Sequence, residues 1–184
     1  MTTDHWGATK RLLEMCEAKG LTVIERADPD GLVHFTDWRE AIFGGVAATY
    51  LPFEKTMYLN WKGLAEYGGY MGHVHELGHV VWSLLLTTQE RWVGYTRLWG
   101  AARRAKILLD WYAETKPEEG WAQDFEAFWT GEPTPGHMDI DHGRAELQAT
   151  DPARYVFMLK VMTRLGAEVG HYADESDKPF LTPG

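Results

Sequence analysis

The sequence His75-Glu76-Leu77-Gly78-His79 lies inside an apolar run that extends from Met71 to Leu86. On an α-helix, residues four positions apart share one face, so the imidazoles of His75 and His79 would converge. Two neutral imidazoles at this spacing can hold a zinc ion, and Glu76 would stand where a carboxylate can take a proton from metal-bound water. Burying two histidines and a glutamate in so apolar a helix is costly unless they serve a function. This HExxH motif therefore predicts a metal site on a buried helix.

The length and charge of the chain narrow the class of protein. A chain of 184 residues suits one domain, and its net charge of −9, without any run of Lys or Arg, makes nucleic acids and membranes poor partners. The single cysteine, Cys16, excludes an internal disulfide and a cysteine-based zinc site, and we expect it in the core. The first residues do not resemble a signal peptide, and no apolar stretch is long enough to cross a bilayer. We expect a cytoplasmic protein by default, with release from the cell or association with a virion left open; the oligomeric state is not determined.

The pattern of apolar residues and turn signals predicts an α+β fold in one domain. The expected elements are a helix over Asp4–Lys19, short strands over Leu21–Ile24 and Leu32–Phe35, a helical turn over Asp37–Ile42, a hairpin of Val46–Leu51 and Thr56–Asn60, the HExxH helix, and helices over Arg97–Ala113, Lys116–Trp129 and Asp151–Leu165. Within this domain we expect a first helix and the sheet in residues 1–62, a helical half with the HExxH motif in residues 63–173, and a frayed tail in residues 174–184. A small mixed or antiparallel sheet thus precedes the HExxH helix, which is the order that zinc-dependent peptidases commonly use.

A catalytic zinc site needs a third protein ligand and one open position for water. The metzincin spacing would place a histidine six residues after His79, where this chain has Leu85, so that class is excluded. The ligand must then come from further along the chain. The candidates are Glu90, Asp110, Glu114, Glu118, Glu119, Asp124, Glu126, His137 and His142.

Spacing and helix signals reduce this set. Glu90 follows His79 too closely for the chain to leave that helix, turn and return to its metal face. Thr115-Lys116-Pro117-Glu118 has the form of a capping box, which would give Glu118 a structural role and leave Glu119 free. A helical wheel nevertheless puts Glu118 nearer the centre of the apolar stripe formed by the residues that follow. The residues alone therefore favour Glu119 and keep Glu118 as an alternative.

The segment from Tyr112 to Phe125 resembles the second half of the catalytic domain of anthrax lethal-factor-like zinc metallopeptidases, a family that includes the secreted Pro-Pro endopeptidases. That family combines HExxH with a tyrosine, six intervening residues, and a glutamate that opens a helix of the type E-x-aromatic-A-x-x-F. In this chain Glu119 follows His79 by 40 positions and Tyr112 by seven, and the similarity covers roughly residues 46–129. The resemblance implies a zincin-like fold.

The same resemblance implies a role for each matching residue. His75, His79 and Glu119 would bind zinc, Glu76 would be the general base, and Tyr112 would donate a hydrogen bond to the oxyanion. One position departs from the family pattern: a second glutamate often stands four residues after the ligand, where this chain has Gln123. This departure weakens any supporting role at that position without changing the ligand set.

Three other groups have simpler explanations. His73 is two residues before His75, so on a helix it points away from the metal face, and we expect it to pack at the helix start. The alternating polar residues His137–His142 follow Pro135-Gly136, and we expect a solvated turn there instead of a second metal site. Arg103, Arg104 and Lys106 are expected on the solvent face of a helix.

Taken together, the residues and the resemblance predict a zinc metalloendopeptidase of the gluzincin type that acts on a peptide or protein. The substrate would run as an added strand along the hairpin edge near Val46–Tyr50. Two alternatives stay open. One is a regulatory HExxH metallopeptidase of the kind that cleaves phage-type repressors. The other is a zincin-fold structural or binding module of a phage or toxin system with little turnover.

Overall fold

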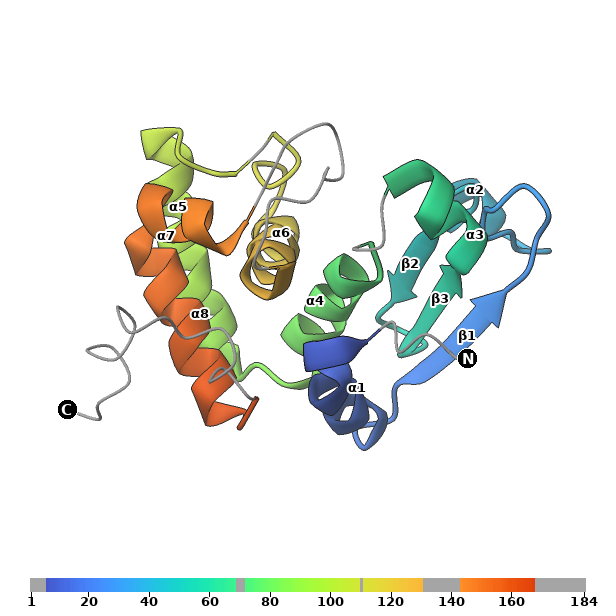
Figure 1. Ribbon diagram of the computed structural model, residues 1–184, viewed down its shortest axis with the longest axis horizontal. Coiled ribbons are helices and arrows are strands. Elements are labelled where there is room, and N and C mark those ends of the chain that lie inside the picture. The colour runs from blue at the N-terminus through green and yellow to red at the C-terminus, as the bar shows by residue number, and fades with distance from the viewer. Residues whose placement is uncertain (1–5, 69–71, 110, 131–142, 168–184) are drawn as a thin grey trace.

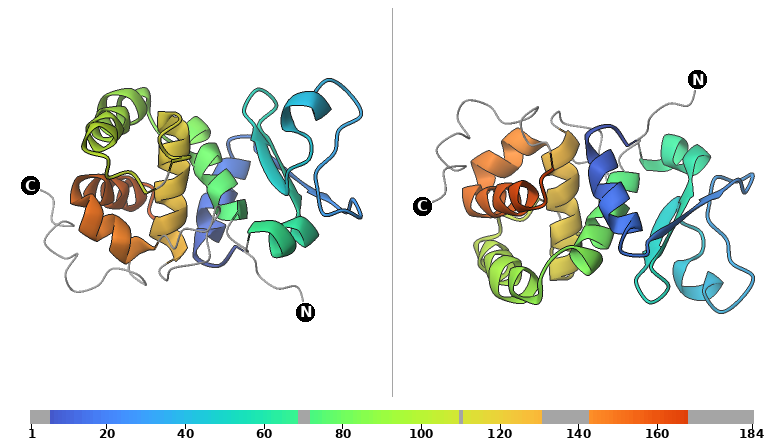
Figure 2. Two further views of the ribbon diagram at one scale, coloured as in Figure 1. Left: turned by 90° about the horizontal axis from the view of Figure 1, so that it is seen from above. Right: turned by 90° about the horizontal axis from the view of Figure 1, so that it is seen from below.

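The structure is a computed structural model that describes residues 6–68, 72–109, 111–130 and 143–167. A small sheet lies at one end of the molecule and a group of helices at the other (Figure 1). The helix that carries the HExxH motif, α4 (Gly72–Leu84), runs between them. The sheet lies on one side of α4 and helix α6 (Pro117–Thr130) on the other, as two further views also show (Figure 2). The α+β class predicted from the sequence is therefore confirmed.

The sheet has three strands, β1 (Thr22–Arg26), β2 (Ala48–Leu51) and β3 (Thr56–Asn60), in the order β1-β3-β2. β3 pairs with β1 in parallel and with β2 in antiparallel orientation, so the sheet is mixed. The expected hairpin of β2 and β3 is confirmed. Because β3 is the central strand, β2 lies at the edge of the sheet that faces α4 (Figure 1).

The central strand β3 is buried along its whole length, and its side chains alternate between two cores. Met57 and Leu59 belong to the large core that includes α4 and helix α1 (Lys10–Glu17). Tyr58 belongs to a smaller core on the opposite face of the sheet, with Val33, Phe35 and Leu51. The sheet is thus fixed between the helices and a covering loop.

The segment Leu32–Phe35 forms no strand, contrary to the prediction. Only Val33 makes a bridge, to Val46. Side chains instead of a neighbouring strand bond to its backbone carbonyls. Arg26 donates to the carbonyl of His34 at 2.6 Å, and Asn60 donates to the carbonyl of Leu32 at 3.2 Å. The segment is consequently held as a fixed loop beside the sheet.

The remaining elements are mostly short. They are η1 (Gly7–Thr9), α2 (Glu40–Phe43), α3 (Trp61–Gly63), the π-helical turn η2 (Leu64–Gly68), the π-helix η3 (Gln89–Tyr95), α5 (Thr96–Ala105), α7 (Arg144–Thr150) and α8 (Pro152–Arg164). The first predicted helix is shorter than expected, since α1 begins at Lys10 after η1. α7 was not predicted. Within the described residues, no helix combines the length and apolar character that a membrane-spanning segment needs.

One predicted helix end and one predicted helix cap are wrong for local reasons. The helix expected over Arg97–Ala113 stops at Ala105, because Lys106 adopts a left-handed conformation with φ of 57° and closes the helix. The capping box expected at Thr115 and Glu118 does not form. The Thr115 backbone N–H and hydroxyl both donate to the carbonyl of Tyr112, at 3.1 and 2.7 Å, and α6 begins two residues later with Pro117 in its first turn.

The close packing of α4 against α6 is what positions the two helices of the site. At Gly78, inside the HExxH motif, an added Cβ would lie 3.0 Å from the Cα of Ala122 and 3.2 Å from the Cβ of Phe125. The indole N–H of Trp121 donates to the carbonyl of Gly78 at 2.9 Å. The glycine between the two histidines therefore lets α6 approach α4 closely.

A buried ion network fixes the other side of α6. Arg154 of α8 is fully buried, and its Nη1 lies 2.6 and 2.8 Å from the carboxylate oxygens of Asp124 on α6. Its Nε donates to Asp151 at 2.7 Å, and the hydroxyl of Tyr95 donates to Asp124 at 2.6 Å. Asp151 also caps α8, as the Asp-Pro start predicts. Three segments of the helical half are thereby tied together.

Candidate metal centre

His75 and His79 of α4 and Glu119 of α6 meet at one point. One ligand atom from each residue lies within 4.8 Å of the others. The Oε2 atom of Glu119 is 3.0 Å from Nε2 of His79 and 3.3 Å from Nε2 of His75. Ligand atoms around a tetrahedral zinc ion lie about 3.3 Å apart, given metal–ligand bonds of about 2.0–2.1 Å. Two imidazoles and one carboxylate at these separations fit a divalent cation, with room for a fourth ligand.

The charges around the three residues favour a cation. Burial disfavours charge on His75, but the neighbouring carboxylates of Glu119 and Glu126 outweigh this effect and raise the pKa of His75 to about 10. Burial also acts against the ionised carboxyl of Glu119, yet the two imidazoles hold the pKa of Glu119 far below its usual range. The carboxylate thus stays ionised at neutral pH. A metal ion would supply the positive charge after displacing the proton of His75.

The structure places Glu119, and not its neighbour Glu118, beside the two imidazoles. Glu119 is buried, whereas Glu118 is half-buried and lines an adjoining cavity. Among the described candidates, Glu90 and Asp124 have other partners: Glu90 bonds to Arg164 and caps the segment after α4, and Asp124 bonds to Arg154. The candidates Asp110, His137 and His142 lie outside the described residues, as does the loop predicted over His137–His142.

Two further residues contact this cluster: Lys116, which the sequence did not indicate, and Glu126, which was among the candidates for the third ligand. The ammonium group of Lys116 lies 3.1 Å from Oε1 of Glu119. The Oε2 atom of Glu126 lies 3.4 Å from Nδ1 of His75, on the side of the ring away from Glu119. Helical periodicity could have indicated Glu126, because it stands seven positions after Glu119 and so shares its face of α6.

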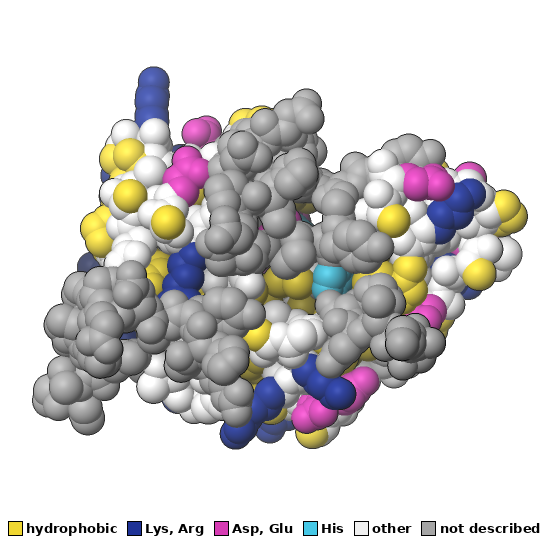
Figure 3. Space-filling view, viewed as in Figure 1, with side chains coloured by type: hydrophobic (Ala, Val, Ile, Leu, Met, Phe, Trp, Pro, Cys, Tyr) yellow, Lys and Arg dark blue, Asp and Glu magenta, His cyan; other side chains and the backbone are white. Residues whose placement is uncertain are grey.

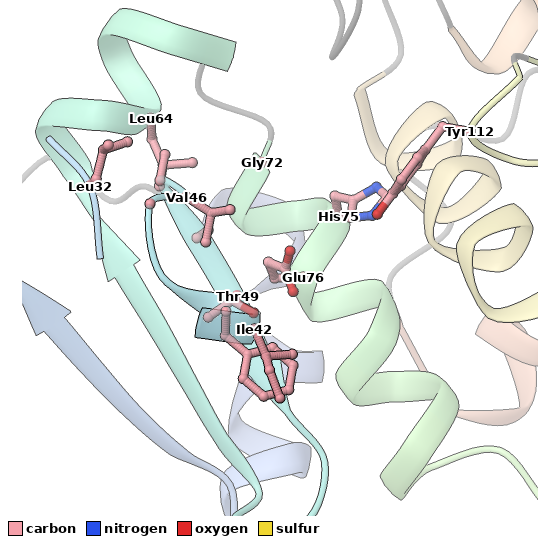
Figure 4. Close-up of a pocket in the computed structure, with 13 residues that line it drawn as sticks. Leu32, Ile42, Val46, Thr49, Leu64, Gly72, His75, Glu76 and Tyr112 are labelled. Carbon is pink, nitrogen blue, oxygen red and sulfur yellow. The ribbon is translucent and has the colours of Figure 1, made fainter. Parts of the chain in front are cut away.

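Glu76 and Tyr112 face the space in front of the cluster. Glu76 is half-buried and points into a cavity between α4 and the β2 side, while Tyr112 reaches toward His75 from the opposite side (Figure 4). The rings of Tyr112 and His75 have centroids 6.0 Å apart. The turn that carries Tyr112 is held by Thr115 and by Trp99, whose indole N–H donates to the carbonyl of Ala113 at 2.8 Å.

Two cavities meet at the cluster. One of about 560 Å³ lies between α4 and the β2 region, and His75 lines it; the other, of about 710 Å³, is lined by His79 and Glu119. Both cavities share Glu76 and Tyr112 in their walls. They form one groove along the edge of the sheet. The three candidate ligands therefore lie where a molecule in the groove would pass.

The other predictions about single residues can be compared with the structure directly. His73 is buried against the rings of Trp6 and Trp61, at centroid distances of 5.0 and 5.2 Å, and does not join the metal cluster. Cys16 is fully buried, and burial raises the pKa of its thiol to about 12. Gln123 is buried on α6, four positions after Glu119. Arg103, Arg104 and Lys106 are exposed, as expected.

No family model matches the chain, and comparison with curated proteins and with solved structures finds no match either. The functional argument accordingly rests on the residues and their geometry.

Proposed function

We propose that the protein is a zinc-dependent endopeptidase with a zincin-like arrangement of sheet edge, HExxH helix and glutamate helix. The observation that carries this proposal is the convergence of His75, His79 and Glu119 at the floor of a groove, with Glu76 facing the same groove. Two histidines and one carboxylate form a ligand set of catalytic zinc sites, which keep a position open for water or substrate. A purely structural zinc site would use all four positions for protein ligands.

The reaction would be the hydrolysis of a peptide bond. Zinc held by His75, His79 and Glu119 would lower the pKa of water and polarise the scissile carbonyl. Glu76 would accept the proton of the attacking water and pass it to the leaving amine. The hydroxyl of Tyr112 would donate a hydrogen bond to the carbonyl oxygen as negative charge develops there.

The unpaired edge of the sheet favours a polypeptide as the substrate. In the described part of the chain, β2 has a ladder partner only in β3, so its other edge is open toward the groove. The residues Val46–Thr49 line the groove along this edge. An extended peptide would add to β2 as a further strand, with its backbone hydrogen-bonded to the edge and its scissile bond above Glu76.

An apolar surface next to the groove favours substrates with large apolar side chains. We call Trp38, Ile42, Phe43 and Phe53 the aromatic ledge. Ile42 and Phe43 line both cavities, the rings of Trp38 and Phe53 stack at a centroid distance of 5.8 Å, and Trp38, Ile42 and Phe53 are each about 60% exposed. Exposed apolar clusters of this kind mark binding surfaces.

On the described part of the face in Figure 3, basic side chains are scattered among acidic ones and form no surface suited to nucleic acid.

The decisive experiment measures zinc and cleavage in the same preparations. We expect one zinc per chain and cleavage of a mixed peptide library by the wild type. Glu76→Gln should keep the zinc and lose at least about 100-fold in rate, the usual contribution of a general base. Tyr112→Phe should keep the zinc and lose less. Wild-type cleavage rates in Glu76→Gln would refute the mechanism, and stoichiometric zinc without cleavage of any peptide would favour a binding module.

A further inference from the structure

Glu126 is a buried carboxylate, with its side chain only 8% exposed, on the buried helix α6. Burying an ionised carboxylate is costly unless a cation or hydrogen-bond donors compensate it. Its Oε2 atom makes no hydrogen bond of ordinary geometry to the described residues, and the polar atom beside it is Nδ1 of His75, at 3.4 Å. The burial of Glu126 is therefore best explained by His75.

The imidazole of His75 lies between two carboxylates of the same helix. Its Nε2 faces Glu119 at 3.3 Å, and its Nδ1 faces Glu126 at 3.4 Å. The two glutamates are seven positions apart, which is about 10 Å, or two turns, along α6. One face of α6 thus contacts both nitrogens of the ring that also takes part in the metal cluster.

A histidine that binds a metal through Nε2 must carry its proton on Nδ1. An acceptor at Nδ1 fixes that tautomer and the orientation of the ring, and it makes Nε2 a stronger ligand. Glu126 is such an acceptor. His79, Glu119 and His75 could bind a metal without it, but His75 would then lose the group that holds its ring.

The charge balance of the buried centre supports the same role. Carboxylates close to a divalent cation at His75 and His79 lessen the cost of burying it. Glu119 lies in the cluster, and Glu76 faces the same groove. Glu126 adds a further carboxylate behind His75, while Gln123, which stands between Glu119 and Glu126 along α6, is neutral.

We propose that Glu126 is a positioning residue of the metal centre: its carboxylate accepts a hydrogen bond from the Nδ1–H of His75 and thereby holds Nε2 toward the metal. This proposal rests on the metal site of the proposed function. It assigns the supporting carboxylate to the position seven residues after the ligand Glu119, one turn beyond the position that Gln123 occupies.

The first test compares zinc affinity in the full chain, measured by competition with a chromophoric chelator. Glu126→Ala should weaken zinc binding about 10–100-fold, the usual effect of removing a group behind a metal ligand. Glu126→Gln keeps an acceptor oxygen without the charge, so its loss should be smaller. Glu14→Gln removes an exposed carboxylate from α1, outside both cavities, and should leave the affinity unchanged. Circular dichroism confirms that each variant is folded.

The second test needs no variant. In the zinc-loaded wild type, ¹⁵N NMR of the imidazoles should show His75 bound through Nε2 with a slowly exchanging proton on Nδ1. A His75 that binds through Nδ1, or that lacks this proton, would overturn the proposal. So would folded Glu126 variants with the affinity of the wild type, even though the metal site itself would stand. A wild type that takes up no zinc would instead overturn the metal site, and this proposal with it.

Discussion

Gly78→Ala tests whether the close crossing of α4 and α6 holds the metal cluster together. The new Cβ would lie 3.0 Å from the Cα of Ala122, and 3.2 and 3.3 Å from Cβ and Cδ1 of Phe125. Carbon atoms in contact prefer about 3.5–4.0 Å, so the crossing would have to open by about 0.5 Å. The crossing lies one residue from His79 and three from Glu119 along the two helices. Because the crossing lies so near the cluster, the distances of 3.0 and 3.3 Å between Glu119 and the two imidazoles would lengthen as the helices move apart.

The expected change in stability combines two opposing effects. Replacing glycine by alanine inside a helix raises the free energy of unfolding by about 1 kcal/mol through helix propensity. Overpacking a close contact lowers it by about 1–3 kcal/mol. We therefore expect Gly78→Ala to lower the free energy of unfolding by about 0–2 kcal/mol and to weaken zinc binding. Gly100→Ala in α5 is the matched control, because its Cβ would meet only the flexible end of Arg104, at 3.6 Å. That variant should be more stable by about 1 kcal/mol, because alanine has the higher helix propensity, and its zinc affinity should be unchanged.

Urea denaturation and a zinc titration of both variants measure these effects. The reasoning predicts that Gly78→Ala is less stable than Gly100→Ala by about 1–3 kcal/mol, which is the overpacking cost alone. In a domain of this size, 1 kcal/mol corresponds to about 2–4 °C in Tm. Equal stability of the two variants, together with unchanged zinc affinity in Gly78→Ala, would show that the two helices do not depend on a glycine at their crossing.

Three further predictions concern other parts of the molecule. Arg154→Ala leaves buried carboxylates without their cation and should cost about 3–5 kcal/mol in urea denaturation; a cost below about 1 kcal/mol would contradict the proposed role of the network. Hydrogen bonds to Glu40 and then Asp30 raise the pKa of His34 to about 9. The stabilisation from its protonated ring should therefore be complete below pH of about 6.5 and be lost as the pH rises through about 9; an NMR titration midpoint near 6.5 would refute this. Phe53→Ser in the aromatic ledge should raise KM about tenfold for peptides with large apolar side chains, while kcat is kept; an equal rise for polar peptides would argue against the ledge.

Local patterns predicted most of the elements near the site. The hairpin of β2 and β3, the HExxH helix, α6 and the Asp-Pro start of α8 follow from alternation, helical spacing and turn residues, which act over a few positions. The same kind of pattern gave a wrong prediction for the segment 32–35. It forms no strand, because the side chains of Arg26 and Asn60 bond to its backbone carbonyls. A capping box did form, at Thr87 and Glu90, whereas the one expected at Thr115 is replaced by a turn.

The sequence alone determined that His75, Glu76 and His79 stand on one buried helix, because their spacing matches the helical period. Tertiary structure decided which glutamate joins them. Glu118 and Glu119 are about 100° apart around α6, so only the angle and closeness of its packing on α4 bring one of them to the imidazoles. The same packing puts Glu126 behind His75. Contacts between residues 44 positions apart, as His75 and Glu119 are, depend on how whole helices pack, and no local pattern contains that information.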